Sequence, residues 1–414
     1  MNNLNINIIG GAYIEECSFP RRQIFRGSGG RAAAFLSSVD IKTVFHTTLG
    51  RGSRQNFEKL AEIFGYTINC LGERDEIVFR YNYPLASPVI FHNSADHFQY
   101  DKQITCDNTL VFGMLENRPA VNSKKVVYDA QDGCRAVPFE SNGSSAEEIA
   151  LVLSLSEGKA LSGKTDPNDI VKKLMVQKNL STVVLKCGPQ GAMVSDSKGN
   201  TEWVSPFKSK RVYKIGSGDI FSAAFAYAWM LHDIDPIVST WFASKCCSLY
   251  VETGIDKFSL TSIADALETA NSRKMSHASS LPCGIPKGYI YLAGPFFNTA
   301  QQWLINDVRR ALLDMGFYVF SPIHDVGIGS AEMVATKDLQ AIEKADVVLA
   351  ILDGLDAGTL FEIGFAKAKG IKIVAIAEST QGEALTMITG SGCEIIDDLT
   401  TGIYAACWEL MSHV

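Results

Sequence analysis

The sequence predicts an α/β protein of two domains, the second being a smaller, doubly wound domain with a parallel sheet. The chain has 414 residues, more than a single hydrophobic core usually organises. Short apolar runs alternate with helical stretches in both parts of the chain, as in parallel sheets covered by helices. A polar segment rich in Pro, Gly and Ser separates the two parts. We therefore expect domains at residues 1–270 and 288–414, joined by a linker at residues 271–287.

In the first part, five short runs predict strands: Ile6–Ile9, Thr43–Thr47, Leu110–Phe112, Val126–Asp129 and Thr182–Lys186. The stretches Ser145–Leu155 and Pro167–Gln177 predict helices between strands. Alternating aromatic and polar residues across Ile77–Ile104, with Pro84 and Pro88, favour an antiparallel lid or an edge insertion.

The second part repeats the alternation on a smaller scale. The expected strands are Gly288–Ala293, Phe317–Phe320, Val347–Leu352 and Lys372–Ile376, and the expected helices are Thr299–Met315, Ala331–Lys344 and Thr359–Lys369. This order predicts a doubly wound sheet whose functional loops follow the carboxyl ends of the strands.

Composition excludes several classes of protein. Apolar residues make up 46% and charged residues 20%, which is typical of a globular protein rather than a disordered one. The net charge of -7 and the lack of a long Lys/Arg run argue against nucleic acid as a partner. The longest apolar run, Ala223–Leu231, is too short to cross a membrane. Ten cysteines without a CxxC pair indicate reduced thiols, so we expect a soluble, cytoplasmic protein.

The first candidate site is the stretch VYKIGSGDIFSAAFAYAWML, in which Gly216, Ser217 and Gly218 precede an amphipathic helix. Their backbone N–H groups would point into one pocket at the positive end of that helix, an arrangement that suits a phosphoryl group. Asp219 would lie in the first turn, where it could accept the proton of an attacking hydroxyl. An ordinary helix-capping turn explains the same four residues equally well.

This stretch resembles the second signature of the ribokinase-like (PfkB) carbohydrate kinases, and the resemblance extends over about residues 1 to 270. It implies a Rossmann-like ribokinase fold with a β lid, and ATP with Mg²⁺ as cofactors. By the same resemblance, Gly188 and Gly191 in VVLKCGPQG would lie beside the ATP phosphates. Ser244 and Gly254 in ASKCCSLYVETG would lie near the adenine pocket, and Glu157 would hold Mg²⁺ through water.

The sugar-binding side departs from the family pattern. The family usually has Asn where Ser154 stands, and its first signature carries Asn after the glycine pair, where GSGGRAAAF has Arg31. The sugar-contacting acid has only Glu15 and Glu16 as candidates. Two hypotheses therefore stay open for this domain: an active kinase, and a domain that binds a nucleoside or nucleotide without phosphorylating anything.

The second candidate site begins with IYLAGPFF, where a strand runs into Gly294 and is followed by Phe296 and Phe297. Two aromatic rings could hold a planar base, although such a pair also occurs in ordinary cores. Acidic residues follow near strand ends and helix starts: Asp338, Asp346, Asp353, Asp356 and Glu362. Glu362 is expected in the first turn of its helix, where the helix dipole favours the ionised carboxylate that a double displacement at an anomeric carbon needs.

Residues 288–378 closely resemble the nucleoside 2-deoxyribosyltransferases, in the runs IYLAGPFF, KDLQAIEKADVVLAILDG and DAGTLFEIGFAKAKGIKIVAI. The resemblance implies a flavodoxin-like domain that needs no cofactor. Glu362 would be the nucleophile, Asp356 the acid that handles the base, and Asp338 the residue that orients the nucleophile. Tyr291 would be a hydrogen-bonding neighbour of Glu362, and Phe296 would line the base pocket. Aromatic residues after the first glycine favour free nucleosides over nucleotides, and related transferases often form homo-oligomers.

Together these observations predict a bifunctional nucleoside-processing enzyme. The C-terminal domain would cleave or exchange the N-glycosidic bond of a (2'-deoxy)nucleoside, and the N-terminal domain would transfer phosphate from ATP to a sugar or nucleoside hydroxyl. The alternative is a nucleoside or nucleotide N-glycosidase, a hydrolase, regulated by an inactive kinase-like domain that senses nucleotides. The expected partners are small nucleosides, nucleotides and sugars.

Overall fold

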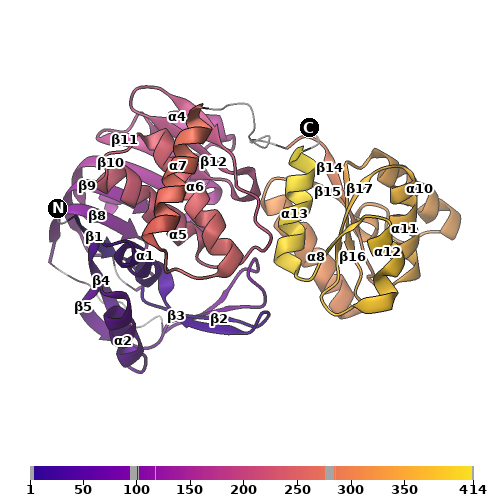
Figure 1. Cartoon of the computed structure of the whole chain (residues 1–414), viewed down its shortest axis with the longest axis horizontal. Helices are drawn as coiled ribbons and strands as arrows, with labels where there is room; N and C mark the ends of the chain where they lie inside the picture. Colours follow the sequence, from indigo (N-terminus) through magenta and orange to yellow (C-terminus); the bar gives the residue numbers. More distant parts are fainter. Residues whose placement is uncertain are drawn as a thin grey trace. The chain divides into compact units, whose positions relative to one another are not determined.

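The computed structural model describes residues 4–93, 100, 102–116, 118–275, 284 and 286–412. It contains two compact units, an N-terminal unit built from residues before 281 and a C-terminal unit built mainly from residues 281–414 (Figure 1). Helix α7 (Leu260–Met275) includes the first five residues of the expected linker. Residues 276–283 and 285, which make up most of the rest of that linker, lie outside the described residues.

The N-terminal unit is built on a nine-stranded sheet in the order β13-β12-β11-β10-β9-β8-β1-β4-β5. The neighbouring strands from β11 to β5 in that order are all parallel. Near one edge, β12 runs antiparallel to both of its neighbours, β11 and β13. The bounds are β1 (Asn5–Ile9), β4 (Lys42–Gly50), β5 (Thr67–Arg74), β8 (Ile104–Phe112), β9 (Val121–Asp129), β10 (Ser145–Ser154), β11 (Leu180–Lys186), β12 (Ala192–Asp196) and β13 (Thr201–Val204). All five predicted strands are present in this sheet.

The helix predicted at Ser145–Leu155 was wrong, because this segment is β10. Its Ala and Glu residues favour a helix locally, but the strand lies between β9 and β11 in the middle of the sheet. The residues from Ile149 to Leu153 are all buried. A strand covered on both faces has a continuous apolar run rather than an alternating one, and tertiary burial outweighed local propensity.

Helices cover both faces of this sheet. On one face α1 (Gly27–Ser38), α5 (Ser217–Phe225), α6 (Pro236–Thr253) and α7 pack side by side, as Figure 1 shows. On the other, α4 (Pro167–Leu174) packs against the apolar side chains of β10 and β11, next to α3 (Leu155–Ser162). Further elements are α2 (Arg54–Phe64), η1 (Gly133–Arg135), η2 (Phe139–Asn142), η3 (Gly188–Gln190) and the π-helix η4 (Ala226–Leu231). Among the described helices, none is both long and apolar enough to span a membrane.

A separate four-stranded sheet forms the expected lid, in the order β3-β2-β6-β7. Its strands are β2 (Ile14–Cys17), β3 (Arg22–Phe25), β6 (Val78–Tyr81) and β7 (Val89–Phe91). The β2–β3 and β6–β7 pairs are antiparallel, whereas β2 and β6 are parallel. Of the segment predicted as the lid, residues 94–99 and 101 lie outside the described residues.

The C-terminal unit has the predicted doubly wound architecture, with a five-stranded parallel sheet in the order β15-β14-β16-β17-β18. Figure 1 shows α8 and α13 on one face and α10, α11 and α12 on the other. The strands are β14 (Tyr289–Ala293), β15 (Tyr318–Phe320), β16 (Val347–Ile351), β17 (Lys372–Ile376) and β18 (Glu394–Ile396). The helices are α8 (Thr299–Asp314), α9 (Pro322–Asp325), α10 (Ala331–Lys344), α11 (Ala357–Ala368), η5 (Gly382–Leu385), α12 (Thr386–Gly390) and α13 (Leu399–Ser412).

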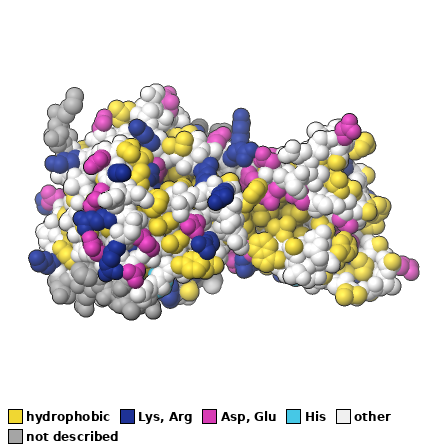
Figure 2. Space-filling model, turned by 90° about the horizontal axis from the view of Figure 1, so that it is seen from below, with side chains coloured by type: hydrophobic (Ala, Val, Ile, Leu, Met, Phe, Trp, Pro, Cys, Tyr) yellow, Lys and Arg dark blue, Asp and Glu magenta, His cyan; other side chains and the backbone are white. Residues whose placement is uncertain are grey.

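Surface charge is mixed over the N-terminal unit. On the face seen in Figure 2, Lys and Arg side chains are interspersed with Asp and Glu. A uniform basic surface, which a polyanion would need, is therefore not present on that face.

Candidate functional site

In the C-terminal unit, the structure brings together three of the predicted site residues. Tyr291 is a buried residue of β14, Glu362 lies on α11, and Asp338 is a buried residue of α10. The Tyr291 hydroxyl donates a hydrogen bond of 2.7 Å to Glu362 Oε1. Asp338 lies close enough to Glu362 for its charge to affect the pKa of that carboxyl. A strand and two helices thus position a pair of acids and a phenol at one place.

The environment makes Glu362 easy to protonate. Burial, with smaller contributions from the charges of Asp338 and Asp356, raises its pKa to about 7, while the hydrogen bond from Tyr291 opposes that shift. Burial also raises the pKa of Asp338 to about 6. Its Oδ1 atom is buried and has no hydrogen-bond partner among the described residues. An unpaired buried carboxylate oxygen is costly unless a ligand or a proton satisfies it, so this group is a candidate for a functional role.

The helix-dipole argument for Glu362 was wrong. Helix α11 begins at Ala357, so Glu362 is its sixth residue and lies in the second turn. The first turn of α11 contains no acidic residue. The dipole effect falls off within the first turn. The ionised carboxylate is instead favoured by the Tyr291 hydroxyl, a contact that only the packing of α11 against β14 creates.

Asp356 is the N-cap of α11. Its Oδ2 accepts hydrogen bonds from the backbone N–H and the hydroxyl of Thr359, at 2.7 and 2.9 Å. Asp356 is partly exposed and lies close enough to Glu362 for its charge to raise the pKa of that group. The capping bonds therefore hold the carboxyl near Glu362, at the solvent-facing side of the site.

The other two acids have structural partners. Asp353 accepts hydrogen bonds from the N–H groups of Glu378, Ser379 and Thr380, which lower its pKa. Asp346 precedes β16 and accepts a hydrogen bond from the N–H of Tyr289 at the beginning of β14. Asp346 thus lies at the amino ends of the strands, and the structure does not bring it to Glu362.

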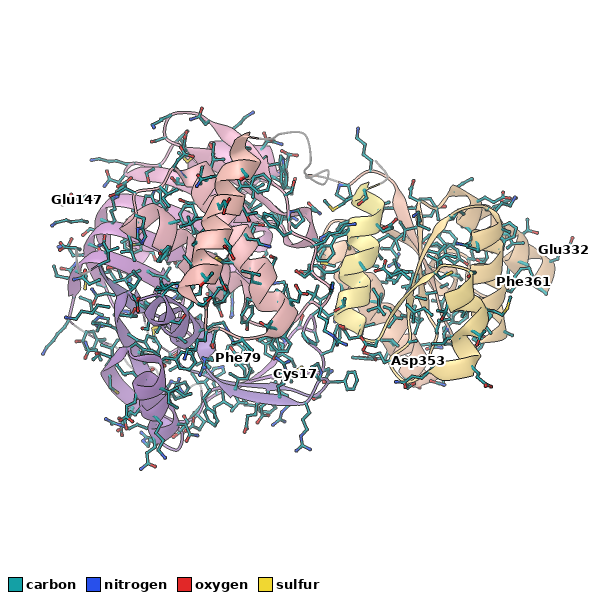
Figure 3. The ribbon with its side chains drawn as sticks, in the orientation of Figure 1. Cys17, Phe79, Glu147, Glu332, Asp353 and Phe361 are labelled. Carbon is teal, nitrogen blue, oxygen red and sulfur yellow. The ribbon has the colours of Figure 1, made fainter. Side chains whose placement is uncertain are left out.

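The predicted base-binding aromatics form a stacked pair. The rings of Phe296 and Phe297 lie 5.4 Å apart, centre to centre. Phe296 is half-buried, whereas Phe297 is 71% exposed. A Cβ on Gly294 would lie 2.7 Å from Ile305 Cδ1 and 3.1 Å from Ile351 Cβ, so glycine allows close packing after the end of β14. Phe361 on α11, labelled in Figure 3 with Asp353, is a further exposed aromatic residue of this unit.

We expect the acid limb of the pH–rate profile for base release to move to higher pH in Tyr291→Phe. The hydrogen bond from Tyr291 stabilises the Glu362 carboxylate and lowers its pKa, so its loss raises the pKa further above about 7. The rate should rise through about pH 7 in the wild type, because the ionised form of Glu362 is the expected nucleophile. The measurement is the pH profile of base release in both proteins, with Tyr318→Phe as an exposed control. An unshifted profile in Tyr291→Phe would contradict this assignment.

In the N-terminal unit, the glycine-rich turn lies where the sequence predicts it. Gly216 has a φ of 80°, a left-handed conformation, and α5 begins at Ser217 with Asp219 in its first turn. Two lysines lie beside this turn. Lys214 Nζ donates to the Ser217 hydroxyl at 3.0 Å, and a Cβ on Gly218 would lie 3.6 Å from Lys186 Nζ. Two ammonium groups beside the start of a helix form a site suited to an anion.

Both lysines are held by the surrounding structure. Lys186 Nζ forms an ion pair of 2.6 Å with Asp129 and lies 3.3 Å from the Ser222 hydroxyl. Burial and the charge of Lys186 lower the pKa of Lys214, whose ammonium has only the Ser217 hydroxyl as a hydrogen-bond partner on the described residues. An anionic ligand would remove that unfavourable burial of charge.

Asp219 is already engaged by protein side chains. Arg31 Nη1 donates to Oδ2 at 2.6 Å, and Gln131 Nε2 donates to Oδ1 at 2.7 Å. Arg31 also forms a two-pronged ion pair with Glu15, and only 1% of Arg31 is exposed. In the sequence, Arg31 differs only from the residue that the family pattern has at this position. An arginine between a glycine pair and the small apolar stretch AAAF signals a buried charge that needs carboxylate partners.

Comparison with known proteins identifies two families. Residues 290–394 match the family model for nucleoside 2-deoxyribosyltransferase. Residues 149–260 match the family model for pfkB family carbohydrate kinases. One chain therefore carries a match to each of these two family models. No curated protein sequence matches it. Both family models describe enzymes, as the sequence predicted.

Several solved structures resemble the N-terminal unit, which contains the PfkB match and is called the PfkB-type unit below. A ribokinase candidate from Agrobacterium tumefaciens is 13% identical, with a TM-score of 0.52, over 66% of this chain and 100% of that chain. Phosphofructokinase-2 from Escherichia coli is 13% identical, with a TM-score of 0.48, over 65% and 100%. Ribokinase from Arabidopsis thaliana, complexed with ribose and ATP, is 16% identical, with a TM-score of 0.48, over 65% and 99%. The first of these shows that the PfkB-type unit has a ribokinase-like fold.

Magnesium, which the PfkB resemblance implies, has a suitable donor set in this unit. Glu157 is buried at the start of α3, and its Oε2 accepts a hydrogen bond of 2.7 Å from the Ser154 N–H in a capping box. Burial and the nearby charge of Glu157 raise the pKa of Asp129 to about 6. Two buried carboxylates that repel each other suit a cation, and Mg²⁺ commonly uses one or two carboxylates together with water and phosphate. The described residues contain no denser cluster of metal-binding side chains.

The remaining predicted PfkB-type residues occupy turns and helix positions. Gly188 and Gly191 have φ values of 60° and 94° between β11 and β12. Ser244 lies on α6, and its hydroxyl donates a hydrogen bond of 3.1 Å to the carbonyl of Ser205. Gly254 caps the C-terminal end of the same helix in the left-handed conformation. Their roles towards ATP stay predictions.

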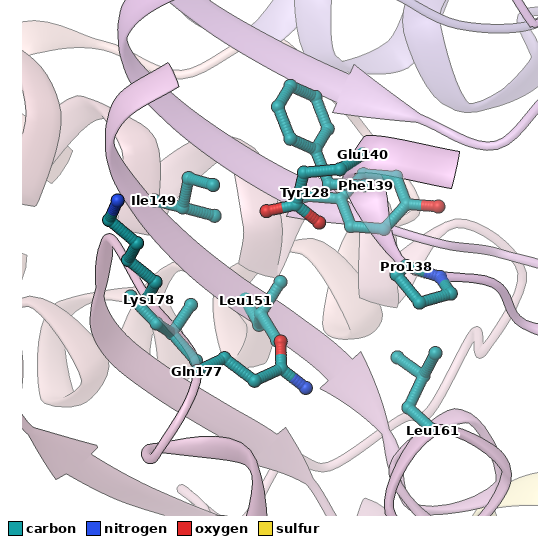
Figure 4. A pocket seen from close by; sticks show the side chains of 10 residues that line it. Tyr128, Pro138, Phe139, Glu140, Ile149, Leu151, Leu161, Gln177 and Lys178 are labelled. Atoms are coloured by element: carbon teal, nitrogen blue, oxygen red, sulfur yellow. The ribbon is translucent and has the colours of Figure 1, made fainter. Parts of the chain in front are cut away.

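A further pocket in this unit contains none of the predicted residues. It is lined mainly by apolar and aromatic side chains, among them Tyr128, Phe139, Leu151 and Leu161 (Figure 4). Because its lining offers few polar groups, it carries no argument about phosphate or nucleoside chemistry.

Proposed function

We propose that the C-terminal unit cleaves or exchanges the N-glycosidic bond of a (2'-deoxy)nucleoside, with Glu362 as the nucleophile. The observation that carries the proposal is the contact of Glu362 with Tyr291, beside the buried carboxyl of Asp338. The matched transferase family supplies the reaction class. A buried carboxyl with a pKa of about 7 is ionised in a useful fraction near neutral pH, and it can both attack and leave.

The proposed reaction has two displacements. First, Glu362 attacks the anomeric carbon, the bond from that carbon to the base nitrogen breaks, and an ester forms between the sugar and Glu362. Asp356 gives a proton to the departing base. Next, a second base or a water molecule attacks the same carbon and gives its proton to the Asp356 carboxylate, and the bond from that carbon to Glu362 breaks so that Glu362 leaves as a carboxylate. Tyr291 donates its hydrogen bond to Glu362 throughout, and Asp338 helps to orient the nucleophile.

The substrate is proposed to be a free nucleoside. The stacked Phe296 and Phe297 offer an apolar surface for a planar base at the end of β14. Transfer to a second base and hydrolysis by water both begin with the same glycosyl–Glu362 ester, so the proposal covers both outcomes.

The test is to trap the ester. Incubation of the protein with a 2'-fluoro nucleoside, which slows the second displacement, should add one glycosyl group to the intact mass. Peptide sequencing should place that group on Glu362. An adduct on another residue, or steady base release without any adduct, would overturn the assignment. Glu332→Gln, on the exposed start of α10, provides a matched variant that should still form the adduct.

For the N-terminal unit we propose binding of a nucleoside triphosphate at the turn before α5. Lys214, Lys186 and the N–H groups of Gly216 and Gly218 would hold the phosphates. Asp129 and Glu157 would hold Mg²⁺ through water, and the ion would offset phosphate charge. Phosphoryl transfer to a sugar or nucleoside hydroxyl stays a competing prediction, since it requires Asp219 to be free to accept a proton.

The two activities are proposed to belong to separate domains, residues 1–270 and 288–414. In the regulatory alternative, ATP bound to the first domain controls base release by the second. We also expect a homo-oligomer, because the resembled transferases often complete their sites with a neighbouring subunit.

A further inference from the structure

Three separate elements of the N-terminal unit meet at Arg31. Glu15 comes from β2 of the lid sheet, Arg31 from α1, and Asp219 from the first turn of α5. Arg31 Nη1 lies 3.1 Å from Glu15 Oε1 and 2.6 Å from Asp219 Oδ2. Burial raises the pKa of Glu15, and the positive charge of Arg31 opposes that shift. One guanidinium therefore ties the lid to the helix that begins the phosphate site.

The neighbouring backbone is shaped around this arginine. A Cβ on Gly216 would lie 2.2 Å from Arg31 Cζ, so only glycine leaves room for the guanidinium there. The left-handed φ of 80° at Gly216 also favours glycine. Glycine is therefore favoured at position 216 for two reasons: the left-handed turn before α5 and the space that the Arg31 side chain occupies.

The space between the lid and α5 is packed with side chains. Cys17 of the lid forms a small core with Tyr213 and Ile215, the residues just before the glycine turn, and Tyr81 of the lid packs against it. Figure 3 labels Cys17 together with Phe79, which is in β6 of the same lid sheet. Both carboxylate oxygens of Asp219 are also occupied, since Arg31 donates a hydrogen bond to one and Gln131 to the other.

We infer that the N-terminal unit binds a nucleoside triphosphate without transferring its phosphate, because Arg31 occupies the acceptor position beside Asp219. This inference rests on the nucleotide binding proposed above. Asp219 serves as the anchor of Arg31 rather than as a base. The proposed phosphate site contains Lys214 and Lys186, and neither lysine contacts Arg31 among the described contacts. Binding of the nucleotide is therefore separable from transfer of its phosphate.

The test measures ATP binding and ADP release in the full chain with Mg²⁺. Calorimetry should show saturable ATP binding, and ADP release should not increase when ribose, 2-deoxyribose or a panel of nucleosides is added. Asp219→Asn keeps an acceptor oxygen for Arg31 and should change the ATP dissociation constant by less than about 3-fold. Lys214→Met removes a phosphate contact and should weaken ATP binding by about 10-fold or more. Lys172→Met, an exposed lysine of α4, is the control.

The possible failures are distinct. ADP release that depends on an added acceptor and disappears in Asp219→Asn would overturn the inference and establish a kinase. Absence of ATP binding in the wild type would instead overturn the proposed nucleotide binding. A loss of ATP binding in Asp219→Asn, in a protein with wild-type melting temperature, would show that Asp219 contacts the ligand and would also count against its role as an anchor of Arg31.

Discussion

Glu362→Gln is expected to reduce base release by on the order of 1,000-fold or more, because the amide cannot form the glycosyl ester. The same change should raise the melting temperature at pH 8. Burial holds the pKa of Glu362 at about 7, above its ordinary value of 4.5, so the ionised group opposes folding at high pH. That difference in pKa corresponds to a destabilisation of on the order of 3 kcal/mol above about pH 7. The destabilisation decreases as the pH falls from about 7 and is gone below about 4.5, because the group is then neutral in both the folded and the unfolded state.

The measurement pairs base-release assays with thermal melting at pH 5 and pH 8. Glu332→Gln is the matched control, since Glu332 lies exposed on α10 and is labelled in Figure 3. It should leave both the rate and the melting temperature nearly unchanged. A Glu362→Gln variant that keeps its activity, or one that melts lower at pH 8 than the wild type, would contradict the proposed role and environment of Glu362.

Arg31→Met is expected to destabilise the protein by about 3–5 kcal/mol at neutral pH. Removing one partner of a buried ion pair leaves the other charge uncompensated, and here two carboxylates, Glu15 and Asp219, would lose the same arginine. Methionine roughly keeps the apolar stem, so the change tests the charge more than the packing. The measurement is urea unfolding followed by a signal from the N-terminal unit.

The control for this variant is Arg51→Met. Arg51 pairs with Asp75 at 2.6 Å, but both side chains are largely exposed, so the loss should be no more than about 1 kcal/mol. Similar effects of the two substitutions would show that Arg31 is not a buried charged centre. Destabilisation of Arg31→Met that becomes smaller at low pH, where the carboxylates take up protons, would support the proposed cause.

Local sequence was sufficient for most of the secondary structure. The strands of the C-terminal sheet and the buried parallel strands of the N-terminal sheet are apolar runs bounded by polar turns, and this pattern depends on neighbouring residues alone. Strand β10 was the exception, because its sequence suits a helix and only its place in the middle of the sheet makes it a strand. Strand β18 and helix α13 of the C-terminal unit were not predicted either, and the same holds for strands β5, β12 and β13 of the N-terminal sheet.

The candidate site residues were named from the sequence, but their electrostatic states were not. The sequence placed Glu362 near the start of a helix, and the family resemblance put Tyr291 next to it. Whether Glu362 is ionised depends on burial, on the hydroxyl of Tyr291 and on Asp338, which come from three elements far apart in the chain. Such contacts have no local signature, since they follow from how the elements pack.

The sequence by itself determined the two α/β units, the glycine turn at Gly216 to Asp219, and the acids of the C-terminal unit, because these depend on patterns of neighbouring residues. Only the tertiary structure decided that Asp219 is paired with Arg31 and that Glu15 shares this arginine. These residues are up to 204 positions apart. A buried arginine is tolerated only where the fold brings carboxylates to it, so its partners cannot be inferred from residues that adjoin it in the chain.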